Sequence, residues 1–246
     1  MRDSEMWSRR QWLAGFGAAS AGALADGCAL PGLRARRLTP TERDLLTRPG
    51  ETLPIVQYRL AGTNLGNVLR QRARTARDLP GRSLARLDRL MRASLKRSGG
   101  VGLAAPQVGL ARRVALVQVQ TRQRPVVTCV DPRILRRSAD RVDGYEACLS
   151  IRGVGGVVSR ARWVDLSYYD LRGRVRHRRS EGWEARIFQH EVDHLDGRLY
   201  VDLVDGSLVP IEEMRRRRRR RPMSMERADP RPTARCPPEP EGVTLL

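Results

Sequence analysis

The sequence predicts an α+β fold, because its regular segments are grouped by type and do not alternate strictly. Two stretches have the apolar spacing of helices, residues 83–99 and 181–195, and the strand-like runs lie between them. Between roughly residues 51 and 205 the composition is that of a globular chain, whereas both ends differ from it. A chain of 246 residues corresponds to one domain, or to one domain with appendages.

The first predicted helix begins at Ser83, whose hydroxyl can accept a hydrogen bond at the N-cap. Apolar residues then recur at helical spacing from Leu84 to Leu95. Gly99 follows the last of them, and glycine is the residue that most readily adopts the left-handed conformation that ends a helix.

Three apolar or β-branched runs after this helix are predicted to be strands. The second should stop at Asp131, since Pro132 follows and cannot donate to a sheet. After the third, residues 170–173 are predicted to turn the chain into a hairpin partner at residues 174–177. The three runs are residues 114–119, 126–130 and 163–169.

The last predicted helix, residues 181–195 with Gly197 as its terminator, carries two of the chain's three histidines. His190 and His194 are four residues apart, so their side chains share one face of the helix. Two imidazoles at this spacing can bind one metal ion, and Glu191 beside them can handle a proton. The alternative is a pair of hydrogen-bonded core histidines.

Catalytic metal sites usually have three protein ligands and one open position, so a third ligand is needed. A metzincin would have a histidine where Tyr200 stands, and a thermolysin-like protease would use Glu212 or Glu213. Cys148, in the segment EACLS, is the better candidate, because one thiolate and two imidazoles form a sound tetrahedral set. Taken alone, Cys148 would more often be a buried structural thiol.

The segment GVGLAAPQ, residues 100–107, is rich in small residues, which let a backbone approach a ligand closely. Gln107 ends it with an amide that can donate to an oxyanion. The alternative is a tight connection between a helix and a strand.

In this order, the segments GVGLAAPQ, EACLS and QHEVDHLDG resemble the GxGxAAxQ, EGCLS and QHExDHLxG segments of peptide deformylases. The resemblance covers about residues 53–205, and residues 67–72 are similar to the family's N-terminal strand. It implies a mixed, mainly antiparallel sheet packed around a central HExxH helix. It also implies a metal-dependent hydrolase that removes the N-terminal formyl group from N-formylmethionyl peptides.

The resemblance implies one divalent metal ion held by Cys148, His190 and His194, with Glu191 as general acid/base. We expect Fe(2+), for which the family is noted and to which a thiolate ligand is suited. The same ligands also suit Zn(2+) or Ni(2+).

The remaining expected site residues contact the substrate. The Gln107 amide and the Leu149 backbone N–H are expected to hold the oxyanion. The peptide is expected to lie along Val101, Gly102 and Leu103 as an added strand.

The chain departs from the family's motifs around the cysteine. Ala147 replaces the usual glycine, and its methyl group is either tolerated or crowds the metal loop. Ile151 and Arg152 stand where many members have a proline after the CLS segment, and the glycine-rich loop at residues 153–156 is expected to be flexible. We expect these changes to alter substrate preference and to leave metal binding intact.

The N-terminus, residues 1–25, resembles a twin-arginine export signal. Arg9 and Arg10 precede a small, weakly apolar run that ends in the A-x-A pattern of residues 23–25. This predicts export to the periplasm or envelope, and without a working signal the chain would be cytoplasmic. Residues 26–50 are predicted to be a linker.

The C-terminus, residues 206–246, is predicted to be a basic, proline-rich, disordered tail, because like charges repel and prolines supply no helix donors. It contains an unbroken arginine run from Arg215 to Arg221, and the net charge of the chain is +20. Such charge favours a polyanion such as the ribosome. The sequence has no apolar stretch of about 18 residues, the length that a transmembrane helix needs. We expect the protein to be a monomer.

Two other functions fit parts of the sequence. An HExxH zinc endopeptidase with a distal carboxylate ligand would keep its metal after Cys148→Ala. An RNA- or ribosome-binding protein with a degenerate deformylase site would bind with steep salt dependence and hydrolyse nothing.

Overall fold

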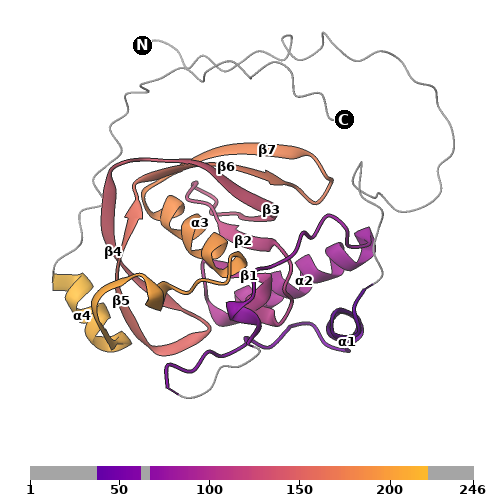
Figure 1. Ribbon diagram of the computed structural model, residues 1–246, viewed down its shortest axis with the longest axis horizontal. Helices are drawn as coiled ribbons and strands as arrows, with labels where there is room; N and C mark the ends of the chain where they lie inside the picture. The colour runs from indigo at the N-terminus through magenta and orange to yellow at the C-terminus, as the bar shows by residue number, and fades with distance from the viewer. Residues whose placement is uncertain (1–37, 62–66, 221–246) are drawn as a thin grey trace, which may run out of the picture.

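The computed structural model describes residues 38–61 and 67–220. Two antiparallel sheets lie against the central helix α3 (Gly182–Leu195), and α2 (Gly81–Ser98) packs beside the first sheet (Figure 1). This arrangement confirms the predicted α+β class and places the HExxH helix at the centre of the described structure. The predicted signal, residues 1–25, lies outside the described residues.

Every pair of strands in the two sheets is antiparallel, and the parallel pairing in the described residues is an isolated bridge between Arg74 and Arg112. The first sheet has the order β1 (Gly102–Ala104), β2 (Val114–Gln118), β3 (Val126–Arg137), β6 (Trp163–Tyr169), β7 (Val175–Glu181). The second has the order β4 (Arg141–Cys148), β5 (Ile151–Ala161), β8 (Val204–Pro210).

The predicted linker, residues 26–50, contains a helix, so the prediction is wrong for this part of it. Helix α1 (Pro40–Thr47) begins with a capping box, in which the Thr39 hydroxyl accepts from the Glu42 amide and the Glu42 carboxylate accepts from the Thr39 amide. Leu46 is buried in the core, which explains why this short helix is held in place.

Helix α2 ends as predicted, at Gly99 in the left-handed conformation with φ of 67°. Its start differs from the prediction, because Pro80 is the N-cap and Ser83 lies inside the helix. The buried face consists of apolar residues at helical spacing: Leu84, Leu87, Leu90, Met91 and Leu95.

The segment similar to the family's N-terminal strand, residues 67–72, is a 3-10 turn instead, η2 (Val68–Arg70). The Asn67 side chain accepts a hydrogen bond from the Leu69 amide at 2.9 Å and so starts the turn. Leu69 is fully buried, and its packing holds the turn against the core.

Strand β3 does not stop at Asp131 as predicted, but continues to Arg137. Asp131 has a φ of 50°, and the register with β6 shifts between Val130 and Arg133. This irregularity takes Pro132 out of the ladder, so its missing N–H leaves no gap in the hydrogen bonding.

The glycines expected to form a flexible loop lie inside strand β5. A Cβ atom on Gly156 would lie 2.6 Å from the Val204 side chain, and one on Gly155 would overlap the Met214 sulfur. These glycines therefore allow β8 and α4 to pack closely on β5.

The predicted disordered tail, residues 206–246, is wrong for residues 206–220. They complete β8 and form α4 (Ile211–Arg220), because Met214 is buried against Gly155 and anchors the basic helix on the second sheet. The prediction followed the charge of the segment and overlooked Ile211 and Met214, which lie three residues apart on one helix face.

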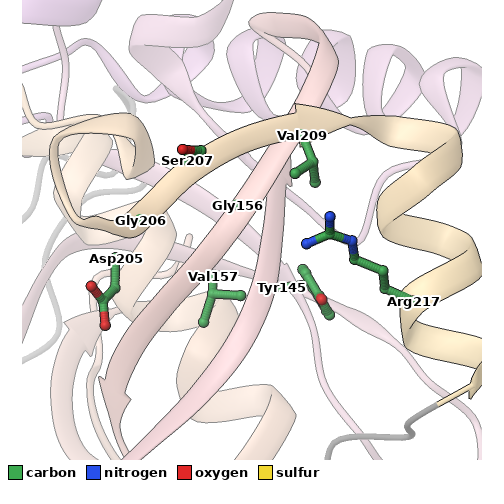
Figure 2. A pocket seen from close by; sticks show the side chains of 8 residues that line it. All are labelled: Tyr145, Gly156, Val157, Asp205, Gly206, Ser207, Val209 and Arg217. Atoms are coloured by element: carbon green, nitrogen blue, oxygen red, sulfur yellow. The ribbon is translucent and has the colours of Figure 1, made fainter.

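Beside α4 is a hollow of about 430 Å³, formed by the second sheet and the helix. Figure 2 shows the Arg217 guanidinium pointing towards Tyr145 across it. No helix in the described ranges has both the length and the apolarity to cross a bilayer.

Candidate metal centre and active site

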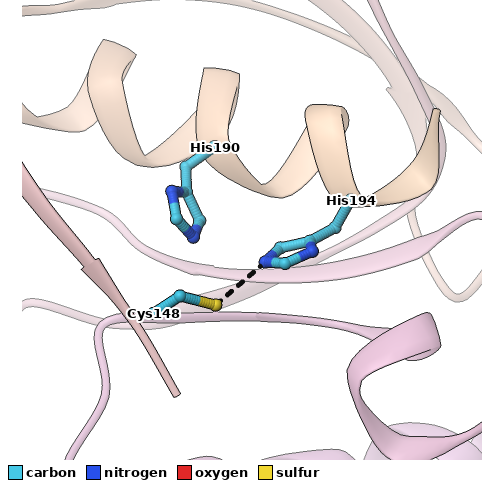
Figure 3. Close-up of side chains that lie close together, drawn as sticks. All are labelled: Cys148, His190 and His194. Carbon is cyan, nitrogen blue, oxygen red and sulfur yellow. Dashed lines mark hydrogen bonds between the residues drawn. The ribbon is translucent and has the colours of Figure 1, made fainter. Parts of the chain in front are cut away.

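Three side chains with metal-binding atoms converge between α3 and the end of β4 (Figure 3). Cys148 is the last residue of β4, and His190 and His194 lie one turn apart on α3. Their donor atoms all lie within 4.8 Å of one another, and the Cys148 sulfur is 3.2 Å from His194 Nε2. Two nitrogens and one sulfur at this separation fit one divalent metal with a position left for a reactant.

The environment of Cys148 favours its thiolate, which is the form that binds metals. Burial opposes ionisation, but the neighbouring His194 and His190 outweigh it and hold the pKa of the thiol well below its usual value. The Ser150 amide also donates to the sulfur, at 3.4 Å.

Glu191 lies beside this centre, on the same helix. Its Oε2 atom is buried and has no hydrogen-bond partner within the described part of the chain. Burial raises the pKa of the Glu191 carboxyl to about 7. A Cβ atom on Gly102 would overlap Glu191 Oε1, so only glycine lets β1 approach this carboxyl so closely. A carboxyl with a pKa near neutrality is suited to both accept and release a proton.

Gln107 is held with its amide group towards the donor atoms. Its Oε1 accepts from the Ala104 amide at 2.8 Å, which leaves Nε2 pointing at Cys148 and Ser150, 3.4 Å from the sulfur and 3.4 Å from the hydroxyl. An amide N–H directed into a catalytic cavity is a suitable oxyanion donor.

Cys148 and His190 line a cavity of about 330 Å³. Three of the residues expected to contact the substrate, Leu149, Val101 and Gly102, line it, whereas the Leu103 side chain is fully buried in the core. Strand β1 is terminal in the order of the first sheet, which leaves a sheet edge beside the cavity. Ala147 also lines the cavity and is exposed, so its methyl group does not crowd the metal loop.

The other ligands considered from the sequence do not reach the centre. Glu212 and Glu213 lie on α4, where they pair with Arg215 and Arg217. Tyr200 stacks on His190 with 6.2 Å between ring centroids, and its hydroxyl donates to a backbone carbonyl of β5.

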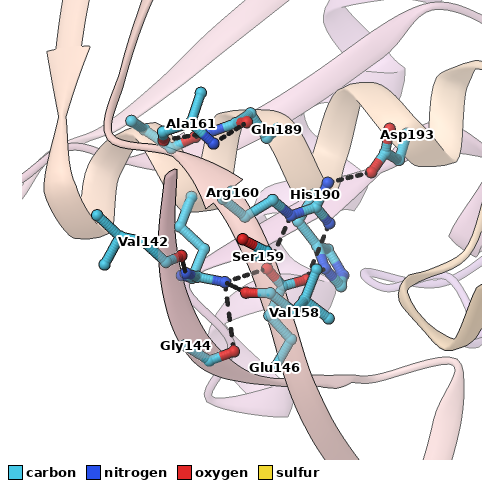
Figure 4. A network of polar contacts seen from close by, with 12 residues as sticks. Val142, Gly144, Glu146, Val158, Ser159, Arg160, Ala161, Gln189, His190 and Asp193 are labelled. Carbon is cyan, nitrogen blue, oxygen red and sulfur yellow. Dashed lines mark hydrogen bonds and ion pairs between the residues drawn. The ribbon is translucent and has the colours of Figure 1, made fainter. Parts of the chain in front are cut away.

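Behind His190 lies a buried network of charged groups that the sequence did not reveal (Figure 4). Glu146 Oε2 is 3.0 Å from His190 Nδ1, while both its oxygens pair with Arg160 at 2.9 Å. Burial alone would raise the pKa of the Glu146 carboxyl. Hydrogen bonds from Arg160 and His190 outweigh burial and hold this pKa well below its usual value. Arg160 also pairs with Asp193. We call Glu146, Arg160, Arg186, Asp193 and His190 the site network.

The ionised Glu146 determines which nitrogen of His190 is available. A carboxylate only accepts hydrogen bonds, so Nδ1 carries the proton and Nε2 remains free to bind a metal. Arg160 and Asp193 were missed because nothing local distinguishes a buried charged residue from an exposed one. The alternation along β5 could have indicated Arg160, since it follows the inward positions of Val158 and Gly156.

Comparison with known proteins agrees with this geometry. A sequence model of the polypeptide deformylase family matches residues 53–208. The chain is 40% identical over 135 residues to a peptide deformylase of Desulforudis audaxviator, covering 55% of this chain and 86% of that one. It is 34% identical over 171 residues to peptide deformylase 2 of Nostoc sp., covering 66% and 92%.

Solved structures are similar too. A class I type b peptide deformylase of Acinetobacter baumannii matches with a TM-score of 0.55 and 34% identity, covering 62% of this chain and 98% of that one. The peptide deformylase of Thermotoga maritima matches with a TM-score of 0.57 and 29% identity, covering 64% and 100%. Because the family model matches more than half of its length, the chain belongs to the peptide deformylase family of metal-dependent amide hydrolases.

Proposed function

We propose that this enzyme removes the formyl group from N-formylmethionyl peptides, with Cys148, His190 and His194 holding an Fe(2+) ion. The observation that carries the proposal is that Cys148 and His190 line one cavity with Glu191 and Gln107, while the His194 donor atom lies within 4.8 Å of theirs. A divalent metal bound there would polarise the formyl carbonyl and make water a better nucleophile. Zn(2+) and Ni(2+) suit the same ligands.

The protein's own groups handle the proton and the charge. Glu191 takes a proton from the attacking water and returns it to the leaving amine, which its pKa of about 7 supports. The Gln107 amide and the Leu149 backbone N–H donate to the oxyanion as it forms. The peptide backbone lies along Val101, Gly102 and Leu103, and the available edge of β1 supports this placement.

A related structure supports a substrate that begins with methionine. The similar Acinetobacter baumannii enzyme was solved with Met-Ala-Ser bound. In this chain the cavity beside the donor atoms has an apolar part, formed by Trp183, Ile187 and Ile211. An apolar side chain of a peptide would be stabilised there by leaving water.

The test is formate release from a formyl-methionyl tripeptide by the full chain, prepared anaerobically with iron(II). We expect release by the natural sequence and none by Cys148→Ala, which loses one of three ligands. Replacement with zinc or nickel then identifies the metal that supports the highest rate. Metal retention by Cys148→Ala would favour the zinc endopeptidase with a distal ligand, and absence of release from a metal-loaded natural chain would contradict the proposal.

We also propose that the arginine run from Arg215 to Arg221 contacts a polyanion such as the ribosome, with the enzyme as a monomer. The exposed Arg215, Arg216 and Arg217 on α4 support this, although Glu212 and Glu213 offset part of their charge. Binding to ribosomes should weaken steeply as salt rises. Equal binding by a chain with these arginines changed to glutamine would contradict the contact.

For the location of the enzyme, we propose export directed by residues 1–25, on the twin-arginine pattern of Arg9 and Arg10. A reporter fused to residues 1–40 should appear in the envelope fraction, and changing both arginines to lysine should retain it in the cytoplasm. A reporter that stays in the cytoplasm without this change would contradict the proposal.

A further inference from the structure

Arg186 lies on α3 one turn before His190, and its side chain is only 7% exposed. Its Nη1 donates to Glu146 at 2.8 Å and to the Val158 carbonyl at 2.8 Å, and its Nη2 donates to the Val142 carbonyl at 2.5 Å. One guanidinium thus joins the HExxH helix to two strands of the second sheet, β4 and β5.

The backbone of β4 is shaped to receive this side chain. Nη1 of Arg186 also donates to the Gly144 carbonyl at 3.3 Å. A Cβ atom on Gly144 would lie 2.5 Å from the Arg186 Cζ, so any residue with a side chain would push the guanidinium out of its place. Gly144 and Arg186 therefore form a matched pair, in which the absent side chain of one makes room for the other.

The position of this pair matters because the metal-binding atoms come from two elements. Cys148 is carried by β4, and both histidines are carried by α3. Arg186 bonds to β4 at Val142, Gly144 and Glu146, and Glu146 in turn orients His190. Buried hydrogen bonds to a charged group are among the stronger links between elements of a fold.

We propose that Arg186 is a positioning residue of the metal centre, which holds β4 against α3 and so fixes both Cys148 and the Glu146 carboxylate that orients His190. This rests on the proposed metal site. Because Arg186 also lines the substrate cavity, loss of activity alone would not separate positioning from peptide contact. The affinity for metal, measured without peptide, does separate them.

The test compares Arg186→Met with Arg112→Met in the full chain. Arg112 is a matched control, because it is also a buried arginine paired with carboxylates, those of Glu42 and Asp78, and does not line the cavity. Both variants should lose stability in thermal unfolding. In competition with a chelator for zinc, Arg186→Met should bind the metal about tenfold more weakly, as for outer partners of metal ligands. Arg112→Met should match the natural chain.

An unchanged zinc dissociation constant in Arg186→Met would overturn the proposal. If that variant does not fold, Gly144→Ala provides the second test, since it displaces the guanidinium while keeping every polar group. Gly144→Ala should also weaken zinc binding, and a folded Gly144→Ala protein with natural affinity would overturn the proposal. If the natural chain binds no zinc, or if Cys148→Ala binds zinc as tightly as the natural chain, the result contradicts the proposed metal site itself. A change in zinc affinity confined to the Arg186 and Gly144 variants tests the role of Arg186.

Discussion

Two buried clusters of arginine and carboxylate in this enzyme have similar ion pairs but hold different groups in place. In the site network, Glu146 pairs with Arg160 through both oxygens and with Arg186 through one, and its Oε2 also contacts His190. In the second cluster, Glu42 pairs with Arg112 and uses its other oxygen to accept from the Thr39 amide. We call Glu42, Asp78 and Arg112 the Arg112 cluster.

The difference lies in what the second carboxylate oxygen holds. Burial opposes ionisation of both carboxyls, yet hydrogen bonds from arginine lower the pKa of each. The Glu42 carboxylate accepts a hydrogen bond from the Thr39 amide at the start of α1. The Glu146 carboxylate instead contacts Nδ1 of His190 in the metal centre. Buried ion pairs contribute little net stability compared with apolar packing of the same volume, whereas removing one partner of such a pair is costly.

The largest effect is expected at Glu191, whose buried Oε2 has no hydrogen-bond partner among the described residues. Glu191→Gln keeps the size of the side chain but removes its ability to take a proton, so kcat/KM should fall by about 10²- to 10⁴-fold. Metal content should not change. Formate release and metal analysis of the same samples check this, and a variant with natural activity would remove Glu191 from the mechanism.

A second prediction sets the two clusters against each other. Glu146→Gln should lower the free energy of unfolding by about 3 to 5 kcal/mol, because it removes the carboxylate that pairs with buried Arg186 and one of the two that pair with buried Arg160. It should also weaken metal binding by about 10- to 100-fold. Urea unfolding and chelator competition measure the two effects.

Glu42→Gln is the control for this prediction. It should lower the free energy of unfolding by a similar amount, since it deprives Arg112 of a buried partner, yet metal affinity should be unchanged. Equal loss of metal affinity in both variants would contradict a specific role for Glu146, because it would mean that the metal centre responds to global stability alone.

A third prediction concerns acid. The pKa of Glu42 is lowered in the folded protein, so its contribution to stability is present above its ordinary value of 4.5 and is lost as pH falls below it. The difference in unfolding free energy between the natural chain and Glu42→Gln should therefore shrink as pH is lowered from 7 towards 3. A difference that stays constant over this range would contradict the assignment.

The smallest effect is expected on α4. The pairs Arg215–Glu212 and Arg217–Glu213 are exposed, and exposed pairs contribute little because water and salt screen them. Changing both arginines to glutamine should leave the melting temperature within measurement error. Met214→Ala on the same helix should lower it, since that side chain is buried against Gly155.

The sequence predicted the helices and strands in which apolar residues recur at regular spacing. Helix α2 and strand β6 were placed within about two residues, a usual margin for such boundaries. The triad of Cys148, His190 and His194 was found because histidines four apart on a helix must share a face. Its third member, Cys148, was the better candidate on ligand chemistry and was also implied by the resemblance, and the fold brings its sulfur close to the two histidines.

The features that were missed depend on contacts between distant segments. Helix α4 was assigned to a disordered tail because its arginines outnumber the single buried Met214 that holds it. The continuation of β3 past Pro132 depends on a bulge at Asp131 and on pairing with β6. Arg186 has no local signal, since its partner Glu146 lies on β4, and for Arg160 only the alternation along β5 gives one.

The fit between Gly144 and Arg186 also has a consequence for how this sequence can change over time. Neither residue can be replaced alone without a collision or an unfilled space, whereas a larger residue at position 144 with a smaller one at position 186 fills the same volume. We therefore expect the two positions to covary among relatives of this enzyme. An arginine at position 186 should occur together with glycine at position 144.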